Sequence, residues 1–141
     1  MIGARTILLA LAVLAVGPAT AQTFSQRFYR DARLKSEFHV QFEIDSVRVP
    51  SETPGLCVVT GKIRKVFRGP VKPGEPVNLD YACKKAADKP KPGATLWTDV
   101  EDLVPAKFVE AYLNRGPYGY AIALWQTKLV PELTDKAQLP P

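Results

Sequence analysis

The sequence predicts a mainly β protein with one or two helices, folded as a small β-barrel, open or closed, in the order strand, strand, strand, helix, strand. Apolar and polar residues alternate along residues 38–44, which is the period of a half-buried strand. The alternation slips by one residue within each of the first two predicted strands, and strands bent in this way suit the wall of a barrel. The two cysteines, Cys57 and Cys83, lie symmetrically about a turn. These three observations carry the fold prediction.

The chain begins with the pattern of a secretory signal peptide. Arg5 precedes an apolar run over residues 7–16, and Ala19-Thr20-Ala21 forms a small-residue cleavage motif. This run is well short of the roughly 20 apolar residues that cross a bilayer, which argues against a retained membrane anchor. We therefore expect residues 1–21 to be cleaved, Gln22 to begin the mature chain, and the protein to be periplasmic or secreted without a transmembrane segment.

The part expected to remain is long enough for one domain. Of the 141 residues, 120 would follow the cleavage site, which suits one hydrophobic core better than two. We expect a single barrel over residues 37–130, preceded by an N-terminal arm or short helix over 22–36 and followed by a polar tail over 131–141. Loss of Arg5 would lower the formal net charge from +5 to +4. This excess is compatible with a polyanionic partner and equally with plain solubility.

The first two predicted strands bend midway. Apolar residues keep one parity from Phe38 to Ile44, but the next one, Val47, follows Ile44 by three positions. A bulge at residues 45–46 would return both groups to one inner face. The second strand slips in the same way, with residues 64–65 as the expected bulge.

The second and third strands are predicted to form a hairpin closed by a disulfide. The midpoint between Cys57 and Cys83 falls on Gly69-Pro70, a turn motif. Folding the chain there predicts three directly opposed pairs on one face: Ile63 with Val77, Val59 with Tyr81, and Cys57 with Cys83. In an exported chain two cysteines favour a structural bridge over a metal site. Both cysteines share the parity of the apolar residues, so we expect a buried bridge without a redox role.

The C-terminal part is predicted to contain a loop, a helix and a last strand. Residues 84–93 have the composition of a loop. A helix is expected to be capped at residues 98–99 and to end at 114–117. A final strand follows over residues 118–130, apolar on both parities through Trp125, so both of its faces are covered or one is a contact surface. The apolar stripe of the helix would be Val104, Phe108 and Tyr112.

The predicted order, with a long bent first strand, resembles the oligonucleotide/oligosaccharide-binding barrel, or OB-fold. Within that class, residues 58–69 (Val-Val-Thr-Gly-Lys-Ile-Arg-Lys-Val-Phe-Arg-Gly) look like the second-strand region of exported barrels related to netrin and tissue-inhibitor-of-metalloprotease modules. The resemblance covers residues 37–83 and implies an OB-like barrel. Those inhibitors present an N-terminal cysteine to the protease zinc, and no cysteine lies near Gln22. Inhibition by that route is therefore not implied.

Candidates for catalysis are few. His39, the single histidine, falls on the outer parity of its strand and is expected to face solvent. Glu43 and Asp45 could form a carboxylate pair of the glycosidase kind, or could be the polar half of an alternating strand. One histidine and two paired cysteines leave no set of nitrogen and sulfur ligands for a metal, and no cofactor is expected.

Two groups of residues could contact a ligand. Lys84, Lys85, Lys89 and Lys91 could form a basic surface for a polyanion, or could be solvated loop residues. Tyr118 and Tyr120 lie at the start of the last strand and could mark a contact surface with Trp97 and Trp125, or could be part of the core. Export argues against nucleic acid as the partner.

The sequence thus favours a non-enzymatic binding module of the cell envelope, with an unknown envelope protein or a polyanionic ligand as its partner. A small envelope hydrolase that uses Glu43 and Asp45, or His39, is one alternative. A polyanion-binding OB-like domain is the other.

Overall fold

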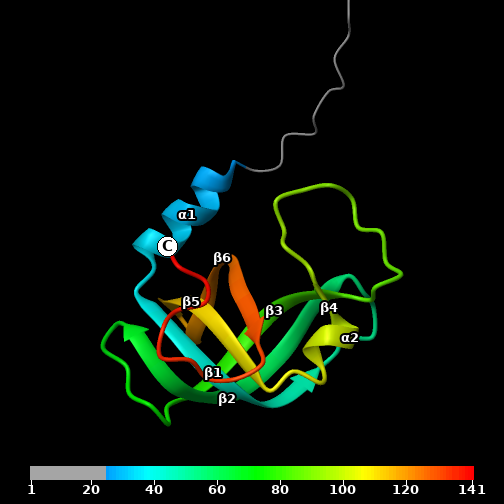
Figure 1. The fold of residues 1–141 in the computed structure, drawn as a ribbon. Helices are drawn as coiled ribbons and strands as arrows, with labels where there is room; N and C mark the ends of the chain where they lie inside the picture. The colour runs from blue at the N-terminus through cyan, green and yellow to red at the C-terminus, as the bar shows by residue number, and fades with distance from the viewer. Residues whose placement is uncertain (1–24) are drawn as a thin grey trace, which may run out of the picture.

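Six strands of the computed structural model form one sheet in the order β4-β3-β2-β1-β5-β6 (Figure 1). The structure describes residues 25–141, so the predicted signal peptide lies outside the described residues. Neighbouring strands are antiparallel except β3 and β4, which are parallel. The elements are α1 (Gln26–Lys35), β1 (Phe38–Arg48), β2 (Gly55–Arg68), β3 (Pro76–Lys84), β4 (Thr98–Asp99), α2 (Val100–Leu103), β5 (Phe108–Gly116) and β6 (Gly119–Val130).

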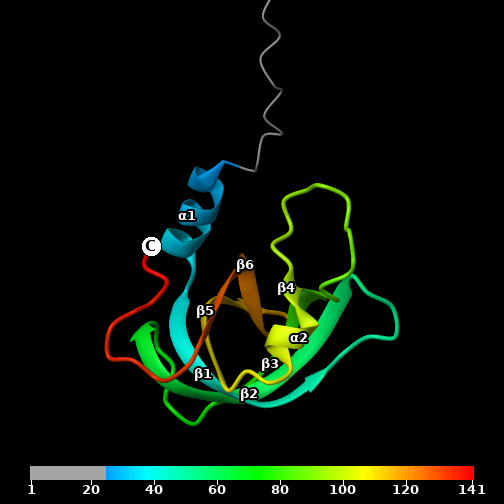
Figure 2. The same ribbon diagram turned by 45° about the vertical axis from the view of Figure 1, so that its right-hand side comes forward.

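Bulges curl this sheet into a small open barrel (Figure 2). The ladder between β1 and β2 skips Asp45 and Arg64, and both skipped positions lie in the predicted bulges. A third shift, between His39 and Val40, adds to the bend. At Gly61 the two strands approach so closely that a Cβ atom would lie 2.1 Å from the carbonyl oxygen of Glu43. The prediction of a mainly β fold with bent strands and an open barrel is confirmed.

The concave face of the curled sheet carries the hydrophobic core. Most inward-facing residues of β1, β2, β3 and β5 are buried, and Leu103 of α2 joins them. Burying a large apolar side chain contributes about 1.5–3 kcal/mol, so this face dominates stability. The largest apolar side chains of this cluster are Phe38, Phe42, Ile63, Leu79, Leu103 and Leu113.

The predicted disulfide between Cys57 and Cys83 is present, and both residues are fully buried. The predicted register of the hairpin is wrong by two residues, because Cys57 lies opposite Tyr81 and Cys83 opposite Gly55. The bridge therefore runs diagonally across the strand pair, with the two Cα atoms 5.8 Å apart. A shift of two residues keeps every side chain on its predicted face, and so the core prediction survives the error.

The long helix predicted after residues 98–99 is wrong. α2 ends at Leu103, two residues before Pro105, and β5 occupies Phe108–Gly116. Proline has no N–H group to donate to a helical carbonyl, so the helical hydrogen bonds stop there even though Val104 still has helical backbone angles. In the strand, Val109 and Leu113 face the core, whereas Glu110 lies on the opposite face beside Gln41 of β1. β5 and β6 thus form a hairpin where a helix and one strand were expected.

The ends of the described chain pack on the barrel. α1 confirms the alternative of a short helix within residues 22–36 and packs against β6. Residues 131–141 are not a free tail, because they run across the outer face of β1 and β5 to a point near α1 (Figure 1). No helix among residues 25–141 is both long and apolar enough to cross a membrane.

Candidate functional site

His39 faces Glu110 of β5 instead of solvent, contrary to the sequence prediction. Its side chain does lie on the outer face of β1, as its parity predicted. That face, however, is covered, and His39 is only 5% exposed. Nε2 of His39 lies 2.7 Å from Oε1 of Glu110, and the ring stacks on Tyr112 at 3.9 Å between ring centroids.

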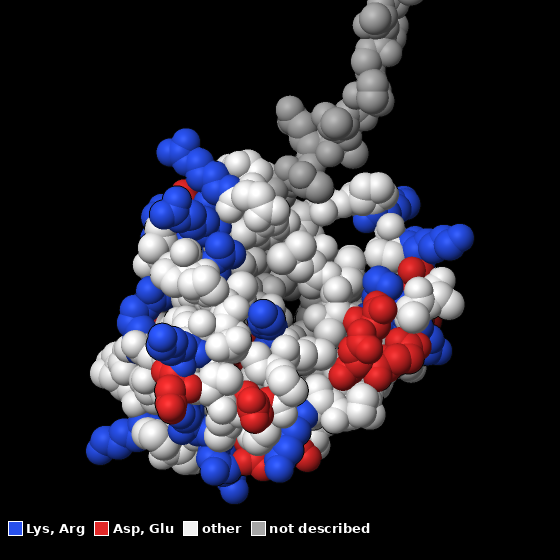
Figure 3. Space-filling view, in the orientation of Figure 1, with Lys and Arg blue, Asp and Glu red and all other residues white. Residues whose placement is uncertain are grey.

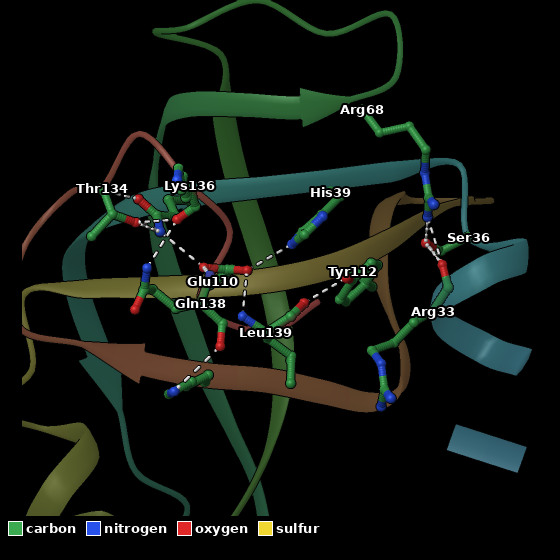
Figure 4. Close-up of polar contacts among 12 residues, drawn as sticks. Arg33, Ser36, His39, Arg68, Glu110, Tyr112, Thr134, Lys136, Gln138 and Leu139 are labelled. Carbon is green, nitrogen blue, oxygen red and sulfur yellow. Dashed lines mark hydrogen bonds and ion pairs between the residues drawn. The ribbon is translucent and has the colours of Figure 1, made fainter. Parts of the chain in front are cut away.

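Glu110 is fully buried and holds the C-terminal segment against the sheet (Figure 4). Its Oε2 accepts hydrogen bonds from the Gln41 side chain at 2.9 Å and from the backbone N–H of Gln138 at 2.8 Å. Its Oε1 accepts from the backbone N–H of Leu139 at 2.8 Å, in addition to the His39 contact. Four donors thus converge on one carboxylate, which compensates for its burial.

The ionisation of this pair follows from its surroundings. Burial lowers the pKa of His39, although the hydrogen bond and the charge of Glu110 act in the opposite direction. Burial alone would raise the pKa of Glu110, but its hydrogen bonds outweigh that effect and lower the pKa. At neutral pH the pair is therefore a neutral imidazole beside a carboxylate. Because every oxygen of Glu110 is occupied by protein donors, we interpret the cluster as a structural latch for residues 131–141.

The carboxylates proposed for hydrolysis do not form a paired site. Glu43 is engaged in an ion pair with Arg64 of β2. Asp45 is the bulged residue of β1 and is exposed. The bulge breaks the regular alternation that would have placed the two side chains on one face.

The four lysines proposed to bind a polyanion lie among acidic residues. Lys84 forms an ion pair with Asp99 at 2.7 Å, and the backbone N–H of Lys85 is bonded to Asp88. Lys89 and Lys91 are exposed on the loop beyond. Figure 3 shows an acidic patch over α2 and β4 beside the lysines of this region. This mixture of charges gives no continuous basic surface.

A groove lies between the β5–β6 turn and β3. Its volume is about 450 Å³. Tyr118, at the tip of the turn, is 101% exposed, so of the two alternatives the core is wrong for this residue. Tyr120 and Trp125 are half-buried in the groove walls. Other side chains that line the groove are those of Leu56, Asn78, Asp80 and Ile122.

A second groove adjoins the first and shares Tyr118 and Tyr120 with it. Its volume is about 380 Å³, and Asp45 also lines it. We call the two together the seam groove. Tyr118 stands between them, so its ring is available to a ligand in either half.

The seam groove follows the opening of the barrel. β3 and β6 are close in space but share no backbone ladder. Two side-chain hydrogen bonds join their sides of the opening instead: Tyr81 to Thr127 at 2.7 Å and Tyr120 to Glu75 at 2.8 Å.

The backbone of β6 is strained where it enters the groove. Leu124 and Trp125 have positive φ angles of 39° and 56°, a region that L residues seldom adopt. Residues 123–126 lie opposite a single residue of β5, Tyr112, and so form a bulge of four residues against one. Strained residues of this kind concentrate at ligand sites, where the surrounding fold holds them in place.

Sequence reasoning selected Tyr118 and Tyr120 but missed their neighbours. Asp80 lies on a different predicted strand, and no pattern in the sequence connects it to the tyrosines. Glu110 was assigned to a helix, although a single acid within the apolar run of residues 108–113 could have drawn attention to it.

No family model, curated protein or solved structure matches this chain.

Proposed function

We propose that this protein is an exported, non-enzymatic binding module whose ligand site is the seam groove. The observation that carries the proposal is Tyr118, an aromatic side chain that is 101% exposed at the rim of a groove lined by Tyr120 and Trp125. Exposed aromatic residues beside a concave surface are typical of contact sites, because they bury a large area on binding at little entropic cost.

Export is supported by two independent features. The N-terminal pattern of residues 1–21 matches a secretory signal peptide. The buried bridge between Cys57 and Cys83 is of a kind that persists in oxidising compartments. Both features fit a periplasmic or secreted protein. We propose an OB-like barrel as its fold.

The proposal that the protein is not an enzyme rests on how its candidate catalytic residues are bonded and buried. The two oxygens of Glu110 are saturated with protein donors, and His39 is buried against them. Glu43 is held by Arg64. None of these groups combines solvent access with a neighbouring partner of the kind that acid–base catalysis requires.

A pull-down from envelope extract with the mature protein as bait tests the proposal. Tyr118→Ala should capture less of the partner than the wild type, whereas Leu96→Ala should capture the same amount. Leu96 is a suitable control because it is also apolar and 45% exposed but does not line the groove. Equal capture by all three proteins would remove the seam groove as the ligand site.

A further inference from the structure

We infer that the seam groove binds an extended peptide segment of a partner protein through a lysine or arginine side chain. This inference rests on the proposed function and adds the chemical class of the ligand. Three features of the groove lead to it: its aromatic faces, its unpaired carboxylates, and the strand edges that border it.

The aromatic faces suit a cation. The positive charge of a Lys or Arg side chain is attracted to the negative face of an aromatic ring, most strongly where water is excluded. Within residues 25–141, the chain's own cations lie over the rings of Phe38, Phe108, Tyr112 and Tyr120. These contacts do not include Tyr118 or Trp125, whose rings line the first half of the groove.

The charged residues that line the groove favour a positively charged ligand. Asp80 lies in the first half of the groove and Asp45 in the second, and both are exposed. The ion pairs in the described part of the chain involve neither of them. No lysine or arginine lines either half. A cationic group would therefore meet two unpaired carboxylates and no lysine or arginine in the lining, whereas an anionic group would be repelled by both carboxylates.

The borders of the groove indicate that the cation is carried by an extended chain. β3 pairs with β2 along one edge and meets β4 only at Cys83 and Lys84, so its edge toward β6 has no ladder over residues 76–82. β6 likewise pairs on one edge only. Because β3 and β6 approach each other across the opening, an extended peptide would lie along the groove and present alternate side chains to its lining instead of adding a strand between them. Asn78 and Asp80, two residues apart, provide that spacing on β3.

Binding of a labelled peptide tests the inference directly. The probe is an acetylated, fluorescein-labelled peptide of alternating lysine and valine. The control peptide is identical except that glutamate replaces each lysine. In fluorescence polarisation with the mature, disulfide-bonded protein, the lysine peptide should bind and the glutamate peptide should not. Asp80→Asn and Tyr118→Ala should each weaken binding about tenfold, and added salt should weaken it further. Asp102→Asn, which removes an exposed carboxylate outside the seam groove, should leave it unchanged.

Three outcomes would overturn the inference. One is equal binding of the lysine and glutamate peptides, and another is binding that Asp80→Asn leaves intact. The third is concentration-dependent self-association, seen by sedimentation velocity and lost in both Tyr118→Ala and a Lys89→Ala/Lys91→Ala double variant. That result would make a second copy of the chain the occupant of the groove.

The pull-down separates this inference from the proposed function. If capture of the partner depends on Tyr118 but the lysine peptide does not compete for the captured partner, the seam groove is still the ligand site and its ligand is not a cationic peptide. If the pull-down is independent of Tyr118, the proposed function fails whatever the peptide does.

Discussion

Glu110 and His39 face each other from adjacent strands, with Nε2 of His39 2.7 Å from Oε1 of Glu110 and both side chains shielded from water. A carboxylate only accepts hydrogen bonds, so Nε2 must carry the hydrogen and Nδ1 of the neutral ring must lack it. This assignment fixes the protonation of the latch that holds residues 131–141.

Replacement of Glu110 by glutamine should release the C-terminal segment. Glutamine has the shape of glutamate, but it would direct an N–H₂ group at one of the backbone donors, Gln138 or Leu139. The free energy of unfolding should fall by about 3 kcal/mol, because hydrogen bonds to a buried charge are lost and a donor is left unpaired. Chemical denaturation measures the loss, and amide exchange at residues 138 and 139 should accelerate. Glu132→Gln, at an exposed position, is the control, and equal stability of the two variants would contradict the latch.

Acid should destabilise the fold in two phases. His39 has a lowered pKa, so as the pH falls through its ordinary value of 6.5 the unfolded chain takes up the proton first and stability declines. The pKa of Glu110 is also lowered, which adds a second decline as the pH falls below its ordinary value of 4.5. Urea midpoints measured from about pH 8 to about pH 2 should show both, and His39→Gln should lack the upper phase. Constant stability in the wild type above about pH 5 would refute the role given to His39.

Loss of the disulfide should be costly. A bridge with a sequence separation of 26 restricts the unfolded chain, and in the loop-entropy model it stabilises the protein by about 3–4 kcal/mol. The Cys57→Ala/Cys83→Ala double variant should unfold at correspondingly lower denaturant concentration. Thiol titration of the unfolded, unreduced wild type should find no free thiol, and two thiols would disprove the bridge.

A methyl group at Gly61 should disrupt the curl of the sheet. The added Cβ would lie 2.1 Å from the backbone oxygen of Glu43, and neither atom belongs to a flexible side chain. Gly61→Ala should therefore cost about 3 kcal/mol or more, at the upper end of overpacking effects. Gly93→Ala is a matched control, because the nearest atom would be 4.0 Å away. Denaturation midpoints that do not separate these variants would contradict the close approach of β1 and β2.

Glycine at position 124 should relieve strain in β6. Leu124 has a φ of 39° and is 39% exposed, so its side chain contributes less to the core than its backbone costs. Leu124→Gly should be neutral or stabilising by up to about 1 kcal/mol. The same change at Ala123, which is only 6% exposed, should destabilise by about 0.5–1 kcal/mol. The reverse order of the two variants in equilibrium unfolding would show that the bulge is unstrained.

Prediction from the sequence succeeded where a local pattern is compatible with only one local structure. The slips of parity at residues 45–46 and 64–65 can be reconciled with one buried face only by bulges, and the structure has them there. Periodicity was ambiguous for residues 104–113, because Val104, Phe108 and Tyr112 fit a helical stripe while Val109 and Leu113 also fit an alternating strand. Pairing of β5 with β1 decided between them, and that pairing is a long-range contact that no local pattern contains.

Prediction of the candidate site from the sequence was also limited by long-range contacts. The parity of His39 predicted its face correctly, yet parity cannot tell which segment covers that face, and residues 131–141 have no pattern that would assign them to it. Tyr118 and Tyr120 were selected by type and position. Asp80 joins them only because the curl of the sheet brings β3 beside the β5–β6 turn.

The way Glu110 holds residues 138 and 139 also bears on how this segment can change in evolution. Both bonds use backbone N–H groups, which every residue except proline possesses. Substitutions at Gln138 and Leu139 can therefore accumulate without loss of the attachment, provided that neither becomes proline. The segment can lose all resemblance between descendants of one ancestor while its docking persists, and selection would be visible at position 110 instead.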